Sequence, residues 1–472
     1  MTSSQRRDLA VPAVLDEALT GLDAILTSHR DRGGFRVLDR RGRPIGARPT
    51  LVGVPVTADD VDAAYAPVSR VALRTALERN TRLSEATGAQ VWLKREDLQV
   101  VRSYKLRGAF HMIARLDPDE RARGLVAASA GNHAQGVAYA ARALGTTARI
   151  YLPRTTPRQK RDRIATLGGP HVQLIVGGET YDAASAAAYE DASRTGATVV
   201  PAFDHPDVIA GQGTVAREAV EQRGGAPDVV VVPVGGGGLV AGMAAWLAAR
   251  HPHTRIVGVE PSGAASMAAA VVSGGPVTLD EVDAFVDGAA VRRVGDHSYA
   301  VLAELARIGH AVELVTVDPG MVSEEMLALF EVDGVIAEPA GALAAAALRL
   351  PDVVAAGESA VAVVSGGNHD VSRYAEVIER ALVSRGVKHY WLVEFPQEPG
   401  ALRRFLDEVL GPDDDITLFE YVKRHNRETG PALVGIELGS PDALGGLVGR
   451  LEDSPVRAKK LSPDDPAFQF LV

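Results

Sequence analysis

From Thr57 onward the chain alternates short runs of β-branched residues with alanine-rich stretches long enough to form helices. The runs are apolar at consecutive positions, which predicts strands buried on both faces. Parallel sheets covered by helices on both sides bury strands in this way. The clearest runs are 90–94, 148–152, 172–176, 229–233, 256–260 and 360–364. The sequence therefore predicts an α/β fold whose functional loops follow the carboxyl ends of the strands.

The pattern changes near residues 384–387. Beyond that point we expect strands at 388–395, 416–423, 432–438 and 456–461, with helices at 401–410 and 443–451. This β-α-β-β-α-β order is that of the ferredoxin-like unit. At the other end, residues 1–56 are expected to form an extension that is disordered or loosely docked, with at most a short helix at 11–26. We therefore expect three parts, at 1–56, 57–385 and 386–472.

Composition excludes several classes of partner. The net charge of -10 argues against a nucleic acid or an anionic membrane surface, because both require an organised basic surface. The apolar runs are too short to span a bilayer, and the first residues are too polar for a secretory signal. Cysteine is absent, which removes disulfides, thiolate metal sites and a cysteine nucleophile. We expect a cytoplasmic protein.

A cluster of charged residues surrounds Lys105 in the segment SYKLRG at 103–108. Arg102 and Arg107 are cationic neighbours. Together with burial, they would lower the pKa of the Lys105 amine from about 10.4 toward the range in which the amine is a nucleophile. The alternative is an exposed basic face at the start of a helix, since runs of charge are usually at the surface.

The segment SAGNHAQG at 129–136 follows a short predicted strand at 125–128. Small residues ahead of a helix leave backbone N–H groups free in its first turn, where a carboxylate or phosphate can bind. Asn132 offers donors and an acceptor, and Ser129 offers a hydroxyl. An ordinary turn capped by Ser129 is the alternative. His133 is at least as compatible with a packed residue as with a catalytic one.

Four successive glycines, Gly235 to Gly238, precede Leu239 between a predicted strand and a predicted helix. Such a run costs chain entropy that a plain turn does not require. Backbone N–H groups directed at a phosphate explain the run better. Its spacing matches neither the dinucleotide fingerprint nor the nucleotide P-loop.

Two further residues stand at the ends of predicted elements. Ser365 directly follows the strand at 360–364, where its hydroxyl could meet a ring heteroatom of a ligand. Glu338 precedes Pro339 at an expected helix start, so it is either a cap or a carboxylate that faces a site. In isolation, each segment is also compatible with an ordinary turn.

Taken together and in this order, these segments resemble the fold type II pyridoxal phosphate enzymes, and among them the biosynthetic threonine dehydratases. The resemblance covers about 57–472 and is most specific in KREDLQ (94–99), SYKLRG (103–108) and SAGNHAQG (129–136). FPQEPGAL (395–402) and TLFEY (417–421) resemble the ACT-like regulatory domain of the same enzymes, and a single copy fits their shorter bacterial form. One departure is Ala76, where the family usually has proline.

By position, the resemblance implies two catalytic residues, Lys105 and Ser365. Lys105 would bind the cofactor as a Schiff base and take the α-proton of the substrate, while Ser365 would face the pyridine nitrogen. Asn132 would hydrogen-bond the ring hydroxyl. The phosphate would be held by Gly235, Gly236, Gly237, Gly238 and Leu239. The substrate carboxylate would be received by Ser129, Ala130, Gly131, Asn132 and His133. No metal is expected.

The resemblance also implies an architecture, with two parallel-sheet subdomains in a catalytic domain at 57–385 and an ACT-like, ferredoxin-like regulatory domain at 386–472. The implied activity is deamination of L-threonine to 2-oxobutanoate and ammonia, the first step of isoleucine biosynthesis, with isoleucine as inhibitor. The expected partners are an amino-acid substrate, an amino-acid effector and further copies of the chain in a homotetramer or homodimer. A serine dehydratase or racemase, or a catalytically silent amino-acid sensor, are the alternatives.

Overall fold

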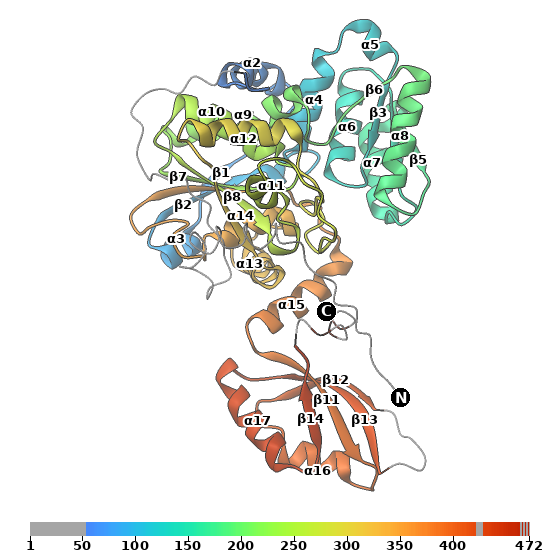
Figure 1. The fold of residues 1–472 in the computed structure, drawn as a ribbon, viewed down its shortest axis with the longest axis vertical. Coiled ribbons are helices and arrows are strands. Elements are labelled where there is room, and N and C mark those ends of the chain that lie inside the picture. The colour runs from blue at the N-terminus through green and yellow to red at the C-terminus, as the bar shows by residue number, and fades with distance from the viewer. Residues whose placement is uncertain (1–52, 422–427, 463–464, 466–467, 469–470, 472) are drawn as a thin grey trace, which may run out of the picture.

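The structure, a computed structural model, describes residues 53–472 apart from 422–427, 463–464, 466–467, 469–470 and 472. These residues form three sheets with their covering helices (Figure 1). Nearly all of the extension expected at 1–56, including the helix at 11–26, lies outside the described residues.

The larger sheet has six strands in the order β1-β2-β10-β7-β8-β9. β1 is antiparallel to β2, and the other neighbouring pairs are parallel. The strands are β1 Leu77–Arg79, β2 Gln90–Arg95, β7 Val229–Pro233, β8 Arg255–Pro261, β9 Glu313–Val317 and β10 Ser359–Val364. Val230 and Val232 of β7 enter one apolar cluster, whereas Val229 and Val231 enter another. The consecutive apolar residues therefore serve two cores, as the sequence predicted.

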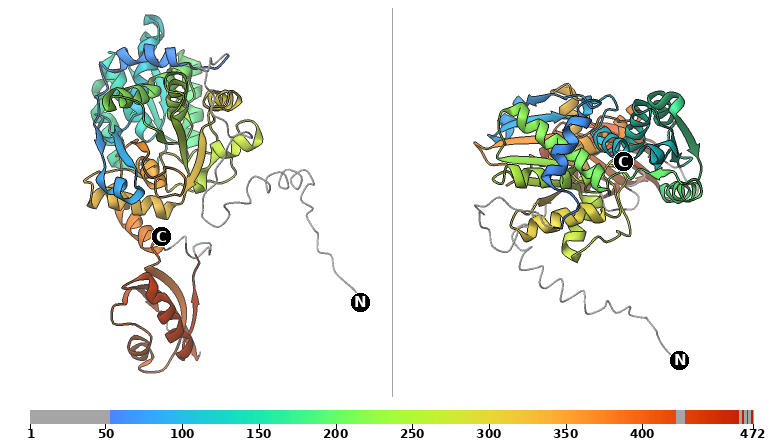
Figure 2. Two further views of the ribbon diagram at one scale, coloured as in Figure 1. Left: turned by 90° about the vertical axis from the view of Figure 1, so that its left-hand side faces the viewer. Right: turned by 90° about the horizontal axis from the view of Figure 1, so that it is seen from above.

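Helices cover both faces of this sheet (Figures 1 and 2). The first core is formed with α2 Ala58–Val68, α9 Pro206–Arg223, α10 Gly238–Arg250, α11 Ser266–Ser273 and α12 Asp296–Arg307. The second is formed with α3 Thr81–Thr87, α13 Pro319–Glu331, α14 Pro339–Ala347 and α15 Tyr374–Ser384. Burial on both faces leaves the strand ends as the places where loops can reach a ligand.

The smaller parallel sheet has the strand order β5-β4-β3-β6. Its strands are β3 Leu125–Ala128, β4 Ala148–Leu152, β5 Val172–Val176 and β6 Thr198–Val199. The accompanying helices are α4 Lys105–Arg115, α5 Pro118–Ala122, α6 Asn132–Ala143, α7 Arg158–Gly168 and α8 Tyr181–Thr195. The second parallel sheet expected for the catalytic part is therefore present.

Close backbone contact between α4 and α9 joins the two parallel-sheet units. A Cβ on Gly108 of α4 would lie 2.6 Å from the carbonyl oxygen of Val208, and one on Gly211 of α9 would lie 2.7 Å from the Cα of Gly108. Only glycine permits helices to approach so closely. The backbone N–H of Gly108 also donates to the side chain of Gln212. The helix that begins at Lys105 is thereby held against the larger unit.

The C-terminal unit is an antiparallel sheet in the order β12-β13-β11-β14. It contains β11 Lys388–Pro396, α16 Ala401–Glu408, β12 Asp415–Tyr421, β13 Thr429–Glu437, α17 Leu444–Asp453 and β14 Arg457–Lys460. The predicted ferredoxin-like order is confirmed. α16 ends at Glu408 rather than at 410, and the expected strand end at 423 lies outside the described residues. This unit stands apart from the two parallel sheets, beyond α15 (Figures 1 and 2).

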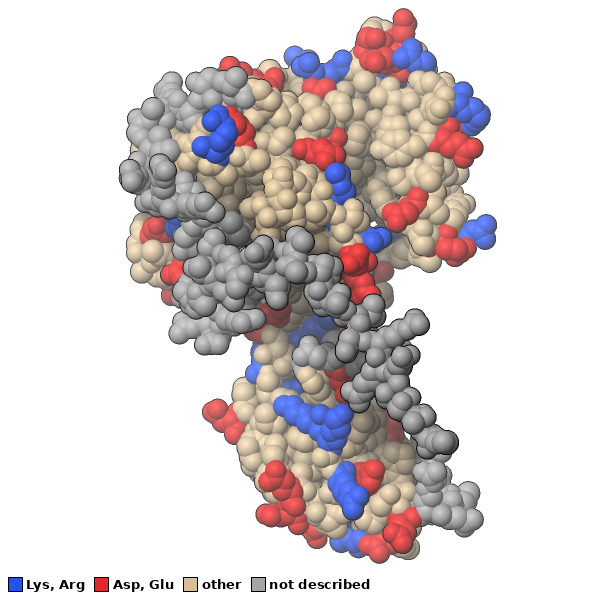
Figure 3. Space-filling view, in the orientation of Figure 1, with Lys and Arg blue, Asp and Glu red and all other residues tan. Residues whose placement is uncertain are grey.

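Charged side chains of both signs are scattered over the face shown in Figure 3, without a broad area of one sign on the described residues. No helix among the described residues is long and apolar enough to cross a membrane.

Candidate active site

Three of the predicted loops follow parallel strands: Ser129 follows β3, Gly235 follows β7 and Ser365 follows β10. The segment before α4 lies beside the loop after β10, because Ser103 pairs with Gly366 in an isolated antiparallel bridge. The backbone N–H of Tyr104 also donates to the Ser365 carbonyl at 3.1 Å. These contacts place the first residue of α4, Lys105, near the end of the larger sheet.

The Nζ of Lys105 donates a hydrogen bond to the carbonyl oxygen of Ala202 at 2.9 Å. Its Nζ also lies 5.4 Å from the ring centroid of Tyr104 and 6.0 Å from that of Phe203. The side chain keeps some exposed surface, but protein atoms enclose the amine. Desolvation by this enclosure lowers the pKa of Lys105 to about 8, against an opposing effect of the Glu338 carboxylate. About a tenth of the amine is therefore neutral near pH 7, far more than at the ordinary lysine pKa of about 10.4.

The predicted cause of this lowered pKa was partly wrong. Burial acts on Lys105 as expected, but the neighbouring arginines do not contribute. Arg107 faces away and pairs with Glu96 at 2.7 Å and with Glu218 at 3.1 Å. The charge run is not an exposed basic face either, because Arg107 is 1% exposed.

A buried network of charges surrounds Arg107. Lys94 pairs with Glu218 at 2.5 Å, and Thr75 donates its hydroxyl to Glu96 at 2.7 Å. The two cations, on Lys94 and Arg107, therefore balance the two carboxylates of Glu96 and Glu218, and all four side chains are buried. Desolvation opposes ionisation of Glu96, yet the charges of Arg107 and Lys94 lower its pKa to about 2. Because this network joins α4, β2 and α9, it positions the helix that carries Lys105.

The predicted carboxylate-binding segment lies at the start of α6, which begins at Asn132. Gly131 is the N-cap residue, and no side chain caps the helix. The first backbone N–H groups of a helix have no partner within it, so this end can bind an anion. The hydroxyl of Ser129 accepts a hydrogen bond from the Gly131 N–H at 3.2 Å, and Ala130 lies between them.

His133 is a packed residue. It is buried, its Nε2 lies 2.8 Å from the carbonyl oxygen of Val200, and burial lowers its pKa to about 4. The imidazole is therefore neutral at pH 7. Its backbone N–H, rather than its ring, is the group that the start of α6 can offer to a ligand.

The glycine run lies between β7 and α10, and packing restricts each position. A Cβ on Gly236 would be 2.2 Å from the Phe203 ring, and one on Gly238 would be 2.8 Å from the Phe203 carbonyl oxygen. Gly237 has a φ of 91°, which side-chain-bearing residues rarely adopt. A Cβ on Gly235 would be 3.0 Å from the Cα of Ala289. The sequence predicted from the entropic cost of four glycines that this loop is unusual. It gave no sign that the ring of Phe203 packs against the loop.

Asn132, Glu338 and Asn368 form a hydrogen-bonded group beside Ser365. The Nδ2 of Asn132 donates to Glu338 at 2.5 Å, and its Oδ1 accepts from the Nδ2 of Asn368 at 2.6 Å. Ser365 is buried and donates its hydroxyl to the Ala340 carbonyl at 3.2 Å. The sequence pointed to Asn132 and Ser365 but not to Asn368, whose side chain gave no separate signal.

The site has the chemistry that pyridoxal phosphate requires. An enclosed amine with a lowered pKa is available at Lys105, and the glycines between β7 and α10 have no room for side chains, so this loop offers only backbone groups to a ligand. The hydroxyl of Ser103 is fully buried and has no hydrogen-bond partner among the described residues. Those residues contain no group of three or more histidine, cysteine, aspartate or glutamate side chains placed to hold a metal.

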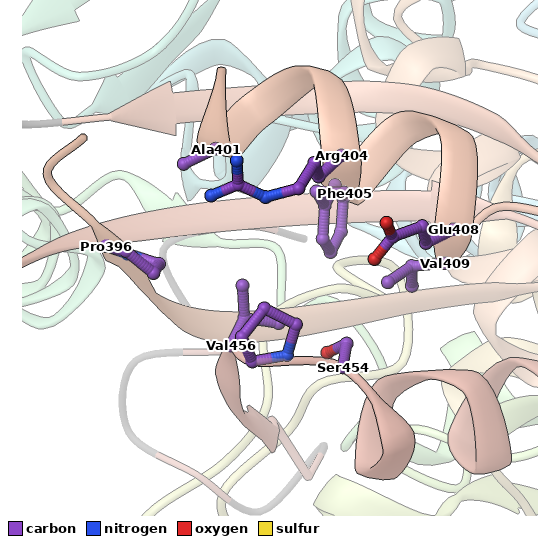
Figure 4. Close-up of a pocket in the computed structure, with 9 residues that line it drawn as sticks. Pro396, Ala401, Arg404, Phe405, Glu408, Val409, Ser454 and Val456 are labelled. Atoms are coloured by element: carbon purple, nitrogen blue, oxygen red, sulfur yellow. The ribbon is translucent and has the colours of Figure 1, made fainter. Parts of the chain in front are cut away.

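A concavity lies in the C-terminal unit, between α16 and the residues just before β14 (Figure 4). It has a volume of about 240 Å³, including space open to solvent. Phe405, Val409 and Val456 form apolar parts of its lining, and Arg404 and Glu408 contribute charges of opposite sign. These two residues are separated by one turn of α16.

Comparisons with known proteins agree with this arrangement. Residues 68–366 match the family described as "Pyridoxal-phosphate dependent enzyme", and residues 379–471 match the "C-terminal regulatory domain of Threonine dehydratase". A biosynthetic L-threonine dehydratase of Mycobacterium tuberculosis is 58% identical over 413 residues, which are 88% of this chain and 95% of that protein. One from Bacillus subtilis is 44% identical over 409 residues, with 87% and 96% covered.

Solved structures are also similar. The processed form of threonine deaminase isoform 2 from Solanum lycopersicum has 36% identity and a TM-score of 0.65, covering 74% of this chain and 98% of its own. The structure of maize serine racemase has 29% identity and a TM-score of 0.63, covering 70% and 98%. Serine racemase is therefore similar in fold, whereas the match at residues 379–471 is to a domain of threonine dehydratase.

Proposed function

We propose that this chain, which belongs to the biosynthetic L-threonine dehydratases among the pyridoxal-phosphate dependent enzymes, deaminates L-threonine to 2-oxobutanoate and ammonia. The observation that carries the proposal is the enclosed amine of Lys105, with its pKa lowered to about 8, near Asn132 and Ser365. The regulatory-domain match and the dehydratase relatives favour threonine over the serine enzymes of the same fold. A silent sensor has no need of this amine.

Each group of site residues is proposed to bind a different part of the cofactor. Lys105 is its covalent anchor, and backbone N–H groups from Gly235 to Leu239 hold its phosphate at the start of α10. Asn132 donates to the ring hydroxyl through the Nδ2 hydrogen that Glu338 does not use. Ser365 faces the ring nitrogen.

Lys105 also acts on the substrate. Pyridoxal phosphate supplies an electron sink for the electrons released when the α-proton leaves. Once the substrate amine had taken its place as the group bonded to the cofactor, the freed amine of Lys105 would remove that proton, and its lowered pKa would keep it partly neutral near pH 7. Loss of the β-hydroxyl as water gives an enamine, which hydrolyses after release to 2-oxobutanoate and ammonia. The segment from Ser129 to His133 receives the substrate carboxylate at the start of α6, where the first backbone N–H groups have no partner within the helix.

Ser365 controls which reaction follows proton removal. A serine hydroxyl stays neutral at pH 7, so it does not fix a positive charge on the ring nitrogen. A ring nitrogen without a fixed positive charge would be a weaker electron sink, and this would favour expulsion of the β-hydroxyl over racemisation or transamination. Replacing Ser365 with aspartate should reduce elimination and increase these side reactions, measured as product ratios. Unchanged ratios would refute this role.

The C-terminal unit is proposed to bind an amino-acid effector, isoleucine, and to shift the enzyme between states of different activity. The chain is further proposed to act in the cytoplasm as a homotetramer or homodimer. Sedimentation analysis of the purified chain tests the assembly, and a monomer at all concentrations would exclude it.

One assay tests the central proposal. Formation of 2-oxo acid from threonine and from serine is followed with and without isoleucine, using the full chain loaded with pyridoxal phosphate. Threonine turnover that isoleucine inhibits is the expected result. A Lys105→Ala protein should lack the yellow absorbance band that borohydride removes. A band in that variant that borohydride does not affect would disprove the role of Lys105 as anchor.

A further inference from the structure

Glu338 is a buried carboxyl group that does not serve its own helix. It is the N-cap residue of α14, but its side chain makes no capping hydrogen bond there. The carboxylate instead accepts from the Nδ2 of Asn132, 206 residues away in sequence, at 2.5 Å. It also accepts from the backbone N–H of Asn368. Glu338 therefore binds Asn132, the side chain proposed to contact the cofactor, instead of capping α14.

The backbone around Glu338 is shaped to admit the carboxylate. A Cβ on Gly366 would lie 2.2 Å from the Oε1 of Glu338 and 3.3 Å from the Nδ2 of Asn132. A Cβ on Gly341 would lie 2.1 Å from the Gly366 carbonyl oxygen. A side chain at Gly341 would therefore push α14 away from the loop after β10, whereas one at Gly366 would displace the Glu338 carboxylate.

The same helix start contacts both residues proposed to flank the cofactor ring. Glu338 holds Asn132, and the carbonyl of Ala340 accepts the hydroxyl of Ser365. Asn368 fixes the other end of the Asn132 amide. The Oδ1 of Asn132 is directed to Asn368, and one of its Nδ2 hydrogens is directed to Glu338. The amide therefore cannot flip, and it presents its second Nδ2 hydrogen, rather than its oxygen, to the cofactor.

We infer that Glu338 is a positioning residue that acts through Asn132, and that its ionisation decides how firmly the cofactor's ring oxygen keeps its own proton. The inference rests on the proposed function. An ionised Glu338 accepts a strong hydrogen bond from one Nδ2 hydrogen of Asn132. The amide nitrogen then holds more electron density, so its other hydrogen is a weaker donor to the ring oxygen. The ionised Glu338 also places a negative charge near the ring oxygen, which then keeps its proton. A neutral Glu338 favours the deprotonated ring oxygen.

Charged groups on two other segments face Glu338. Burial, together with the charge of Asp287 in the loop between α11 and α12, raises its pKa to about 7. Lys160 of α7 lowers it. Lys160 and Asp287 pair with each other at 3.0 Å. These opposing effects leave the carboxyl able to change charge within the working range of an enzyme.

Further titratable groups are contributed by α4 and by the loop after β10. Glu338 raises the pKa of Lys105 and that of Tyr104, so both are close enough to sense its charge. Tyr104 stays neutral throughout this range, because burial already raises its pKa. His369 lies next to Asn368, and burial lowers its pKa, so its ring is neutral near pH 7. Among these groups Lys105 alone is expected to titrate in the same interval, and only in the cofactor-free chain, where its amine is not bonded to the cofactor.

The experiment follows absorbance of the cofactor-loaded full chain over about two pH units on either side of 7. Loss of the ring-oxygen proton strengthens the visible band relative to the near-ultraviolet band. We expect this ratio to fall as the pH rises through the titration of Glu338. Glu338→Gln should hold the ratio of the wild-type low-pH form at every pH. A Glu338→Gln protein that titrates with the wild-type midpoint, or a wild-type ratio that does not change, would overturn the inference.

Two variants keep the test decisive if Glu338→Gln does not fold. Asp287→Asn removes a like charge and should move the midpoint to lower pH, whereas Lys160→Met removes an opposite charge and should move it to higher pH. Midpoints that stay unchanged in both would overturn the inference. A wild-type chain that shows no visible band after loading would instead overturn the proposed function, and the inference with it.

Discussion

The ring of Phe203 lies against Gly236 so closely that an ideal Cβ at residue 236 would be 2.2 Å from the Cγ of the ring. Phe203 belongs to the segment between β6 and α9, which also provides the Ala202 carbonyl that accepts from Lys105. One short segment therefore contacts both the glycine run and the proposed anchor. Its packing sets the position of the backbone that is proposed to hold the phosphate.

Gly236→Ala should therefore weaken cofactor binding as well as folding. The added methyl group displaces either the Phe203 ring or the loop, and overpacking of this kind costs about 1–3 kcal/mol. Pyridoxal phosphate should dissociate faster by a factor of about ten or more. Dissociation is measured as the loss of the visible band after dilution. Thermal unfolding of the cofactor-free protein measures the stability effect separately.

Two matched variants test the cause in Gly236→Ala. Gly275→Ala adds a methyl group where nothing lies within 4 Å, so its stability and cofactor retention should match the wild type. Combining Phe203→Ala with Gly236→Ala should cost less than the sum of the separate changes, because the clash is relieved. Additive effects would contradict the packing explanation.

Arg107→Met should destabilise the chain strongly. It leaves Glu96 and Glu218 buried with only Lys94 to balance them, and breaking a buried ion pair costs about 3–5 kcal/mol. Chemical denaturation of the cofactor-free protein measures the loss. Arg115→Met at the end of the same helix is the control, because Arg115 is 59% exposed and should contribute less than about 1 kcal/mol. Equal losses in the two variants would argue against the network.

Uptake of pyridoxal phosphate by the cofactor-free protein should depend on the charge of Lys105. Its pKa in the folded chain is lowered to about 8, so the neutral amine is scarce below that pH and predominates above it. The rate at which the visible band appears should rise with pH and level off above a midpoint near 8. Lys105→Ala should show no such band at any pH. A midpoint near the ordinary lysine value of about 10.4 would contradict the enclosure of the amine.

Removal of the residues after Arg385 should separate catalysis from regulation. The cut falls between the end of α15 at Ser384 and the start of β11 at Lys388, so it interrupts no helix or strand. Threonine turnover should persist while inhibition by isoleucine disappears, measured as 2-oxobutanoate formation over a range of isoleucine concentrations. Circular dichroism of both proteins controls for folding. Inhibition that survives the truncation would place the effector site in the catalytic domain.

Much of the fold was predictable because burial on both faces leaves a local pattern. The valines of β7 and β10 are apolar at consecutive positions, and both strands are central in a covered parallel sheet. Shorter strands gave weaker patterns. β1 and β6 contain three and two residues, too few to show a period, and neither was predicted. β9 was also missed, although all but its first residue are buried.

The sequence by itself determined which residue types surround the proposed cofactor: a lysine, an asparagine, a glycine run and a serine, each beside an expected strand or helix end. Those are properties of short segments, and short segments carry them in their composition and spacing. Only the tertiary structure decided that Arg107 turns away from Lys105 into a buried network, and that Glu338 reaches Asn132 across 206 residues. Electrostatic effects depend on distance and burial in three dimensions, and neither is encoded in the order of neighbouring residues.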